Sequence, residues 1–406
     1  MMLHTDVMNY SISKKGFLIY MAKKKQKEKK KFNLFTKGSI DYSIWITVMV
    51  LVAFGLIMVL SASAPSALSE TGDSYKYIKK QAISAVIGFI AMAACSKVDY
   101  HIYRKFKWII YVAFIFLLVL VGFVGIDAGG ARRWINIAGF NFQPSEFAKL
   151  GFIIFFAAIL SDVKEHGKIK EYKYGFLYPV VFIGPIVGAI YVLQNHFSAT
   201  FIIGAVTIVQ MFVAGTKIMH FIITGALGIL ALFGGMLAKN GQISLGSGFR
   251  SSRIQTWLDP FSDPTGDGWQ IIQSLYAIGS GGLFGVGLGN SKQKYLYLPE
   301  PHNDFIFSVL AEELGFVGCI IVIILFVIFV WRGIIVSMKA EDNFGCLISI
   351  GIVSMIALQA VINIAVVTGT IPVTGMPLPF FSYGGTALIA NLMAIGVLLN
   401  ISRTTK

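Results

Sequence analysis

The chain has 406 residues, of which 56% are hydrophobic and only 13% are charged. A soluble domain carries about a quarter charged residues, so this composition excludes an ordinary soluble globular protein. The formal net charge of +14 would suit a nucleic-acid-binding protein, but the placement of that charge along the chain argues against this class.

The N-terminal tail holds most of the excess positive charge. Residues 1–38 contain ten lysines and only two acids, Asp6 and Glu28, and so contribute +8 of the net +14. A block of like charge ahead of the first apolar segment is typical of a disordered topology signal or of a segment that lies on anionic lipid. We therefore expect residues 1–41 to form a disordered, basic cytoplasmic tail that binds no nucleic acid, starting at Met1 or Met21.

Apolar stretches of about twenty residues, the length that crosses a bilayer, recur after the tail. They predict an all-α, polytopic integral membrane domain over residues 42–402 with about ten membrane-spanning helices. Pro372, Pro377 and Pro379 predict a kinked turn before the last helix. The predicted spans are 43–63, 81–97, 107–125, 145–161, 176–193, 198–214, 218–238, 304–331, 344–367 and 380–402.

The distribution of positive charge orients these spans. An even number of spans puts both termini on one side of the membrane, and the lysine-rich tail makes that side cytoplasmic. Residues 239–303, between the seventh and eighth spans, then form a large extracellular loop. Long ordered loops on a membrane scaffold are usually functional, so we expect the chemistry at the outer face.

The first candidate site residues lie at the outer mouth of the fourth span. Arg132 and Arg133 precede this span; two guanidinium groups could clamp a diphosphate, although an interfacial anchor is the simpler interpretation. Glu146 and Lys149 are three residues apart in the helix that Pro144 starts, so they share one face. Ionisable groups at a span mouth are usually paired or functional, and this pair either satisfies itself or holds a carboxylate or phosphate.

The run GSGGLFGVGLG, residues 279–289, lies within the long loop. It has no preceding strand and no following Gly-Lys-Ser/Thr, so a nucleotide-binding loop is poorly supported. A tight extracellular or re-entrant turn fits better, followed by Lys292 and Lys294. These two lysines could face anionic headgroups and, like Arg132 and Arg133, could bind a diphosphate. The glycines that we expect to shape the turn are Gly281, Gly282, Gly285, Gly287 and Gly289.

Asp304 stands at the outer mouth of the eighth span, directly after the run LPEPHN. Partial loss of water there could make its carboxylate a general base, but an aspartate before a helix is equally well explained as an N-cap. Glu312 and Glu313, about two turns further along, could form a proton path, although structural hydrogen bonds are the favoured interpretation. The scattered histidines and cysteines give no metal-binding spacing, so no metal site is predicted.

Several separated motifs, taken together, identify a family. The stretch from Trp257 to Gly318 contains LDPFSDPTGDGWQIIQS and AIGSGGLFGVGLGNSKQKYLYLPEPHNDFIFSVLAEELGFVG. With RRWI, QPSEFAK and PLPFFSYGG, it closely resembles the SEDS family (shape, elongation, division and sporulation) over residues 42–402. GLGNSKQK and YLPEPHNDFIF look like the division and sporulation branch, represented by FtsW and SpoVE, more than the elongation branch of RodA.

The resemblance implies a peptidoglycan glycosyltransferase that polymerises lipid II during division or sporulation. The family's essential carboxylate corresponds to Asp304, and a supporting acid–base pair corresponds to Glu146 and Lys149. The resemblance also implies a class B penicillin-binding protein as partner, together with other division or sporulation membrane proteins. No cofactor is implied, although a divalent cation could help bind the diphosphate.

A chemical argument fits this expectation. Undecaprenyl diphosphate is already a good leaving group, so the enzyme would need one base and a cationic clamp and not the two carboxylates of a glycosidase. Arg132 or Arg133 would offset the diphosphate charge. Two alternatives stay open: a lipid II flippase, for which Glu312 and Glu313 would suit a translocation path, and a noncatalytic scaffold.

Overall fold

The structure, a computed structural model, describes residues 38–128, 131–137, 140–194, 197–226, 256–264, 266, 268–295 and 297–405. Within these residues, 8 helices are long and apolar enough to cross a membrane, which confirms a polytopic, predominantly helical membrane protein. They are α2 (Tyr42–Thr71), α3 (Lys76–Lys97), α5 (Lys107–Val124), the segment Tyr172–Tyr191, α8 (Phe197–Ala214), α12 (Ile306–Met338), α13 (Asn343–Val367) and α14 (Gly385–Ser402).

Shorter helical elements complete the described chain. The segment Tyr172–Tyr191 is composite, because π-helical turns flank a short α-helix. Within the predicted long loop, α11 is a helix of 13 residues, and residues 239–255 lie outside the described part. The shorter elements are α4 (His101–Lys105), η1 (Tyr172–Leu177), α7 (Tyr178–Val187), η2 (Gly188–Leu193), η3 (Pro260–Ser262) and α11 (Trp269–Gly281).

Two of the ten predicted spans are not among these 8 helices. The predicted span 145–161 forms α6 (Pro144–Glu165), which has 17 buried residues among its 22; an apolar helix buried on all sides is an interior helix and not a lipid-facing one. The predicted span 218–238 lies mostly outside the described residues, as does the predicted tail 1–41 apart from its last residues.

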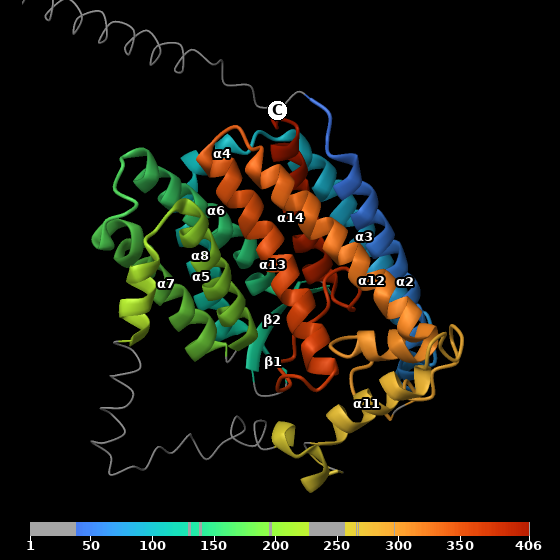
Figure 1. The fold of residues 1–406 in the computed structure, drawn as a ribbon. Helices are drawn as coiled ribbons and strands as arrows, with labels where there is room; N and C mark the ends of the chain where they lie inside the picture. The colour runs from blue at the N-terminus through green and yellow to red at the C-terminus, as the bar shows by residue number, and fades with distance from the viewer. Residues whose placement is uncertain are drawn as a thin grey trace, which may run out of the picture.

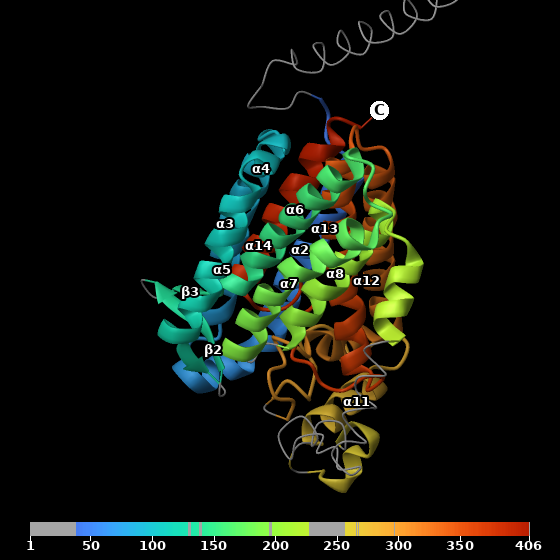
Figure 2. The same cartoon turned by 90° about the vertical axis from the view of Figure 1, so that its left-hand side faces the viewer.

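A small antiparallel sheet between α5 and α6 was not predicted from the sequence. Its strands are β1 (Ile126–Ala128), β2 (Ala131–Ile137) and β3 (Phe140–Phe142), in the order β1-β2-β3. The register pairs Ile126 with Trp134 and Asn136 with Asn141. Figure 2 shows the sheet at the end of the helical bundle away from the C-terminus.

The start of α2 and the end of α14 meet at one end of the bundle, whereas α11 lies at the other (Figure 1). The Asp41 N–H donates to Ser402 Oγ at 3.0 Å, and Arg403 Nη1 donates to the Gly38 carbonyl at 2.6 Å. The described chain therefore begins and ends on the same side, as an even number of spans requires.

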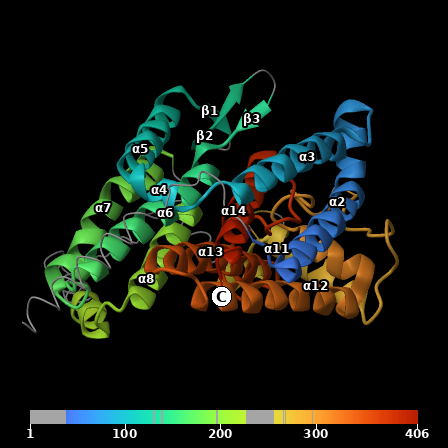
Figure 3. The same cartoon turned by 90° about the horizontal axis from the view of Figure 1, so that it is seen from above.

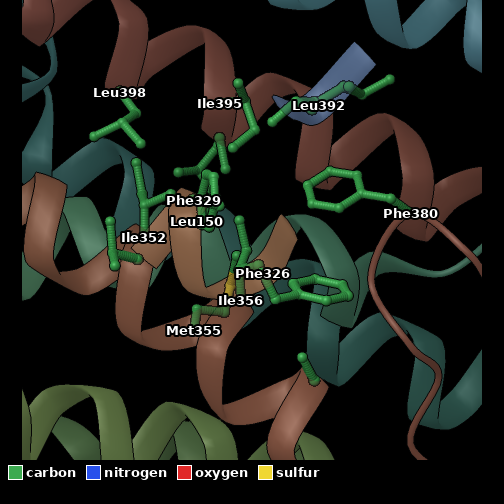
Figure 4. Packing of buried hydrophobic residues seen from close by; sticks show 14 of the residues in the cluster. Leu150, Phe326, Phe329, Ile352, Met355, Ile356, Phe380, Leu392, Ile395 and Leu398 are labelled. Atoms are coloured by element: carbon green, nitrogen blue, oxygen red, sulfur yellow. The ribbon is translucent and has the colours of Figure 1, made fainter. Parts of the chain in front are cut away.

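Seen along the bundle, α5, α7 and α8 form one flank and α2, α3 and α12 form the other (Figure 3). The core between them comes from α6, α12, α13 and α14, and α14 alone buries 15 of its 18 residues. Leu150, Phe329, Ile352 and Ile395 are among the side chains that meet there (Figure 4). This core supports the ends of the same helices that lie opposite the chain termini, where the candidate site residues lie.

His101 joins α4 to the start of α13 at the end of the bundle that holds the termini. Its Nδ1 lies 2.7 Å from Asp99 Oδ1, and its Nε2 lies 3.2 Å from Asp342 Oδ2. Burial lowers the pKa of His101, but the hydrogen bonds to Asp342 and Asp99 outweigh it, so the pKa is raised above its usual value of 6.5. The imidazole therefore links the two carboxylates and binds them more strongly when it is protonated.

We expect replacement of His101 by glutamine to lower thermal stability more at pH 6 than at pH 9. A histidine whose pKa is raised on folding stabilises the protein fully below pH 6.5 and loses this effect as the pH rises through its folded pKa. Because the group is partly exposed, the effect should not exceed ~1 kcal/mol. Unfolding temperatures measured across this pH range, in wild-type and Asp342→Asn backgrounds, check this, since the pH dependence should shrink once Asp342 is neutral.

Candidate active site

Asp304 lies at the end of the bundle opposite the termini. Helix α12 begins at Ile306 and its cap position is Phe305, so Asp304 stands just outside the helix with its side chain half-buried. Asp304 thus immediately precedes the assigned cap position of α12.

Three consecutive carbonyl groups hold the segment 302–304 in place. Each accepts a hydrogen bond from α13 or from the turn before α14, two elements that follow it in the chain. The bonds run from the Tyr383 N–H to the His302 carbonyl (2.8 Å), from Ser382 Oγ to the Asn303 carbonyl (2.7 Å) and from Asn363 Nδ2 to the Asp304 carbonyl (2.7 Å). The backbone at Asp304 is therefore held by residues that lie far from it in the sequence, on α13 and in the turn before α14.

Asn363 is a site residue that the sequence analysis missed. Its side chain is fully buried on α13, and its amide nitrogen donates to the carbonyls of Asp304 and Met376, both at 2.7 Å. One amide thus ties the segment that carries Asp304 to the turn before α14. The available signal was a polar amide inside an apolar span, four residues after Gln359 and hence on the same helix face.

Glu146 and Lys149 form a buried ion pair near the start of α6. Lys149 Nζ lies 2.8 Å from Glu146 Oε2, and the side chains are 4% and 6% exposed, respectively. Pro144 occupies the first turn of the helix, where its missing N–H costs nothing. The predicted sharing of one helix face is confirmed, and each charge neutralises the other in a place where an unpaired charge would be costly.

Two cavities border this ion pair. Glu146, Gln359 and Pro377 line both of them. The first holds about 230 Å³ of empty space and is lined also by Lys149, Ser198, Ala199, Ile202, Gly375 and Met376. The second holds about 270 Å³ and is lined also by Leu378, Pro379, Phe380, Ser382, Ala387, Leu388 and Asn391.

Gln359 is the second site residue that the sequence analysis missed. Its side chain is 3% exposed, and its Oε1 has no hydrogen-bond partner within the described part of the chain. A buried polar atom that borders a cavity normally meets an ordered water or a polar ligand there. The cavities beside Glu146 are therefore suited to polar occupants although they lie among apolar helices.

Gly375 lies next to Asp304 and also lines the cavity of the ion pair. It lines the cavity that Lys149 borders, and a Cβ added to it would lie 3.3 Å from Asp304 Oδ2. Its φ of +68° is a conformation that favours glycine. The Asp304 carboxylate thus lies next to Gly375, in the same short turn that borders the Glu146–Lys149 cavity.

The turn before α14, residues 368–384, is held tightly. Phe380 has a φ of +68°, which is rare for a bulky residue, yet its side chain is only 3% exposed and points into the core of Figure 4. Ser382 Oγ accepts a hydrogen bond from the Leu378 N–H at 2.7 Å. A strained residue persists only where its surroundings over-determine it, so this turn is a rigid wall of the site.

Arg132 and Arg133 lie on β2 of the small sheet. Arg132 is exposed and Arg133 half-buried, and Arg133 Nε donates to the Gln194 carbonyl at 3.2 Å. The sheet packs against α5 and α6, so both arginines lie at the same end of the bundle as the start of α6. The register of β1 and β2 shifts beside these arginines, because Ile126 opposes Trp134 whereas Asp127 opposes Arg132, as in a β-bulge.

The glycine-rich run fills a break in α12. Gly315, with a φ of +66° and a ψ of −166°, interrupts this helix, and residues 282–287 lie against the interruption. The N–H groups of Val286 and Gly287 donate to the Glu312 and Glu313 carbonyls, both at 3.0 Å. In return, the N–H groups of Phe316 and Val317 donate to the Gly282 and Leu283 carbonyls, at 2.9 and 3.1 Å.

Two of the glycines that were predicted to shape the loop allow its close contact with α12. A Cβ on Gly281 would lie 2.0 Å from the Ala311 carbonyl oxygen, and one on Gly285 would lie 2.1 Å from that of Glu313. Such distances allow only glycine. The residues of the run with positive φ are Gly282, Gly285, Gly287 and Gly289.

Lys294 lies in a setting different from the diphosphate contact expected for it. Its ammonium is 3% exposed and lies 2.8 Å from Glu313 Oε1, and it also donates to Ser61 Oγ at 3.0 Å and to the Gly289 carbonyl at 2.6 Å. The Lys294 ammonium therefore links the loop to Glu313 on α12 and to Ser61 on α2. Lys292, by contrast, is exposed.

Glu312 and Glu313 make structural hydrogen bonds, as the sequence analysis favoured. Glu312 accepts from Ser291 Oγ at 2.5 Å and from the Lys292 N–H at 2.8 Å. Glu313 accepts from Ser61 Oγ at 2.7 Å and from Lys294. Both carboxylates therefore hold the loop that follows the glycine-rich run.

His302 is a buried, uncharged neighbour of Asp304. Its ring lies 4.6 Å from that of Tyr77 and 5.7 Å from that of Tyr383. Burial lowers the pKa of His302, and the more distant Glu300 and Glu70 oppose this shift only partly. At neutral pH the imidazole therefore adds aromatic packing and no positive charge beside Asp304.

Metal-binding side chains do not cluster in the described ranges, where no group of three or more His, Cys, Asp or Glu residues could hold an ion.

Comparisons with known proteins identify relatives of this chain. The family model described as Cell cycle protein, which covers FtsW, RodA and SpoVE, matches residues 41–406. Stage V sporulation protein E of Bacillus subtilis (strain 168) is 44% identical over 374 residues, 91% of this chain and 99% of the relative. A protein of Geobacter sp. (strain M18), named probable peptidoglycan glycosyltransferase FtsW, is 42% identical over 89% of this chain and 96% of its own length.

Solved structures show the same fold. A chain from a study of the structural coordination of polymerization and crosslinking by a peptidoglycan synthase complex matches with a TM-score of 0.73 and 28% identity, over 90% of this chain and 98% of that one. The rod shape determining protein RodA of Thermus thermophilus matches with a TM-score of 0.63 and 26% identity, over 90% and 97% of the two chains.

Replacement of Gly315 by alanine should destabilise the protein by at least ~1–3 kcal/mol, because its backbone conformation is open almost only to glycine. The added Cβ would also lie 2.3 Å from the Gly285 nitrogen. Gly204→Ala is the matched control: nothing lies within 4 Å of its added Cβ, and alanine favours a helix. Unfolding temperatures in detergent should fall only for Gly315→Ala; equal stability of the two variants would contradict the break in α12.

Proposed function

The chain belongs to the cell cycle protein family of FtsW, RodA and SpoVE and is a peptidoglycan glycosyltransferase, and we propose that it polymerises lipid II with Asp304 as the general base. The observation that carries this proposal is the placement of the Asp304 carboxylate. It contacts the turn at Gly375, which also borders the cavity of the buried Glu146–Lys149 pair.

The proposed reaction needs one base and one cationic region. The acceptor sugar hydroxyl attacks the anomeric carbon of the donor sugar, and its proton passes to Asp304. A new glycosidic bond forms as the bond to undecaprenyl diphosphate breaks, so the diphosphate leaves with the electron pair. Because the leaving group is a diphosphate, no second carboxylic acid has to protonate it.

Glu146 and Lys149 support this step. The paired ammonium of Lys149 places positive charge beside the cavity without leaving an isolated buried charge. Arg132 and Arg133, on the neighbouring sheet, would offset the charge of the departing diphosphate, because guanidinium groups match phosphate oxygens. We expect no resident cofactor, and a divalent cation that entered with the diphosphate would share this charge.

We also propose the orientation of the protein in the membrane. The lysine-rich residues before α2 favour cytoplasmic termini, and the ends of the described chain meet on that side. Asp304 and the start of α6 then face outward, where a lipid-linked disaccharide would present its sugars. The polyprenyl chains would stay among the apolar helices, which is why a membrane scaffold suits this chemistry.

A transpeptidase is the partner that we propose, specifically a class B penicillin-binding protein acting with other division or sporulation membrane proteins. The support comes from the structural neighbour, which belongs to a peptidoglycan synthase complex that couples polymerization to crosslinking. A polymerase that releases glycan strands at the outer face benefits from a crosslinking enzyme held beside it.

The flippase alternative loses its main support. Glu312 and Glu313, which would suit a translocation path, are committed to the loop residues Ser291, Lys292 and Lys294. Residues that fasten a loop cannot also line an open path. A noncatalytic scaffold would not require the buried Glu146–Lys149 pair beside Asp304.

Asp304→Asn should reduce lipid II polymerisation by roughly 10²–10⁴-fold, the usual contribution of a general base. The assay measures glycan chains formed from labelled lipid II by the purified protein with its cognate transpeptidase. The matched control is Asp73→Asn, which neutralises a carboxylate that pairs with Lys79 in the turn between α2 and α3 and should remain active. Unchanged polymerisation by Asp304→Asn would exclude it as the base, and transport of lipid II in liposomes without polymerisation would favour a flippase.

Asn363→Leu should lower the turnover number more than it raises KM, because its main effect is to free the backbone of Asp304, with Met376 the one residue of the cavity lining that also loses its bond to Asn363. Two buried carbonyls would lose their donor, at a cost of roughly 1–3 kcal/mol each at most. Stability must therefore be measured alongside activity, with Asn363→Asp as a second variant of the same size. A well-folded Asn363→Leu protein with normal turnover would show that Asn363 does not position Asp304.

A further inference from the structure

The glycine-rich loop turns apolar side chains outward. Leu283 is 65% exposed, Phe284 80%, Val286 42% and Leu288 52%. Residues 282–289 contain no charged residue. A contiguous apolar surface of this kind rarely faces water and normally marks a membrane or protein contact.

Several backbone groups of this loop are paired with protein and not left open to hydrocarbon. The N–H groups of Val286 and Gly287 and the carbonyls of Gly282 and Leu283 all bond to α12 at its break. The Gly285 N–H donates to the Gly281 carbonyl at 2.8 Å. Irregular backbone is tolerated at membrane depth only when its polar groups are paired with protein in this way.

The helix lengths place the loop at the outer boundary of the hydrocarbon. Arg332 pairs with Asp41 at 2.5 Å, near the end of the bundle that holds the termini. Gly315 lies roughly 17 residues before Arg332, which is about 25 Å along the helix. Ser61, which bonds to Glu313 and Lys294, lies about 20 residues after Asp41, or about 30 Å. The hydrocarbon core of a bilayer is about 30 Å thick.

The neighbouring surface has the properties of a membrane interface. On α12, directly beside the loop, Phe316 is 59% and Val317 42% exposed, so the apolar surface of the loop continues that of a membrane-spanning helix. Lys292, Tyr295 and Tyr297 follow the loop and are exposed. Tyrosine and lysine are the side chains that favour the headgroup region.

We propose that residues 282–289 form a re-entrant element that inserts Leu283, Phe284, Val286 and Leu288 into the outer leaflet of the bilayer. Its partner is therefore lipid hydrocarbon. Lys292 lies at the level of the headgroups, where it attracts anionic lipid. Figure 1 shows this orange-yellow segment beside the ends of α2 and α12, whereas α11 extends further away.

The insertion gives the active-site segment a membrane anchor. The loop is fastened to α12 by the Lys294–Glu313 pair, and only a short segment separates Lys294 from Asp304. Anchoring the loop in lipid would keep Asp304 at a constant depth relative to membrane-bound substrates. The exposure, hydrogen bonding and depth of the loop favour its insertion into lipid whatever reaction Asp304 carries out.

Cysteine labelling in proteoliposomes tests this inference with the full-length protein alone. The native Cys95, Cys319 and Cys346 are first replaced by serine, and Phe284→Cys is compared with Phe261→Cys. Phe261 is also apolar and 62% exposed, but it lies on η3 in the part of the outer loop before α11. Both probes lie on the same side of the membrane, so their ratio does not depend on how the protein is oriented in the vesicles.

We expect a membrane-impermeant maleimide to label Phe284→Cys at least tenfold more slowly than Phe261→Cys, because the reactive thiolate does not form in hydrocarbon. The two rates should become equal in denaturing detergent. Leu283→Cys serves as a second probe if Phe284→Cys fails to fold. Spin-labelled lipids should also quench a fluorophore at position 284 more strongly than one at 261.

Two results would overturn the proposal. Equal labelling of the two probes in the bilayer would mean that the loop is in water. Fast labelling of Phe284→Cys in the protein alone, with protection appearing only when a transpeptidase partner is added, would mean that the surface binds a protein and not lipid. Neither result depends on polymerase activity, so each is distinguishable from a failure of the proposed function.

Discussion

The hydrogen bonds between the glycine-rich loop and the break in α12 constrain the whole outer end of the molecule. Gly315 interrupts the helix, and the backbone groups that this break frees cannot remain unpaired beside hydrocarbon. Residues 282–287 supply the missing partners, which requires glycine at each close approach. Lys294 then reaches Glu313 in a buried pair. Only a short segment then connects Lys294 to the start of α12, and Asp304 lies in that segment.

Helix α13 links this arrangement to the rest of the site. Asn363 donates to the segment of Asp304 and to the turn before α14, and Gln359, one turn away, borders the cavities beside Glu146. The proposed base and its proposed supporting ion pair come from the segment before α12 and from α6, which are far apart in sequence. A group held by several buried hydrogen bonds does not have to be reorganised at the moment of reaction, which is where a pre-arranged site gains rate.

The membrane explains why the polar groups are arranged in pairs. An isolated charge among apolar helices would be strongly disfavoured, yet polymer synthesis from a lipid diphosphate requires charge close to the membrane. The Glu146–Lys149 and Glu313–Lys294 pairs meet both conditions, since each keeps charge at the outer end of the bundle in neutralised form. One pair borders the site, and the other fastens the loop beside it.

The sequence by itself determined the membrane class, most of the spans, the shared face of Glu146 and Lys149 and the family, because these depend on composition, on helical spacing and on motifs within short segments. It predicted Asp304 as a candidate general base but left open the alternative that this aspartate caps a helix. Only the tertiary structure decided the small sheet, the burial of Lys294 and the roles of Asn363 and Gln359. Lys294 and Ser61 are 233 residues apart, so no local sequence pattern could predict their contact. Local physics selects helices, whereas the partner of each buried polar group is chosen by how those helices pack.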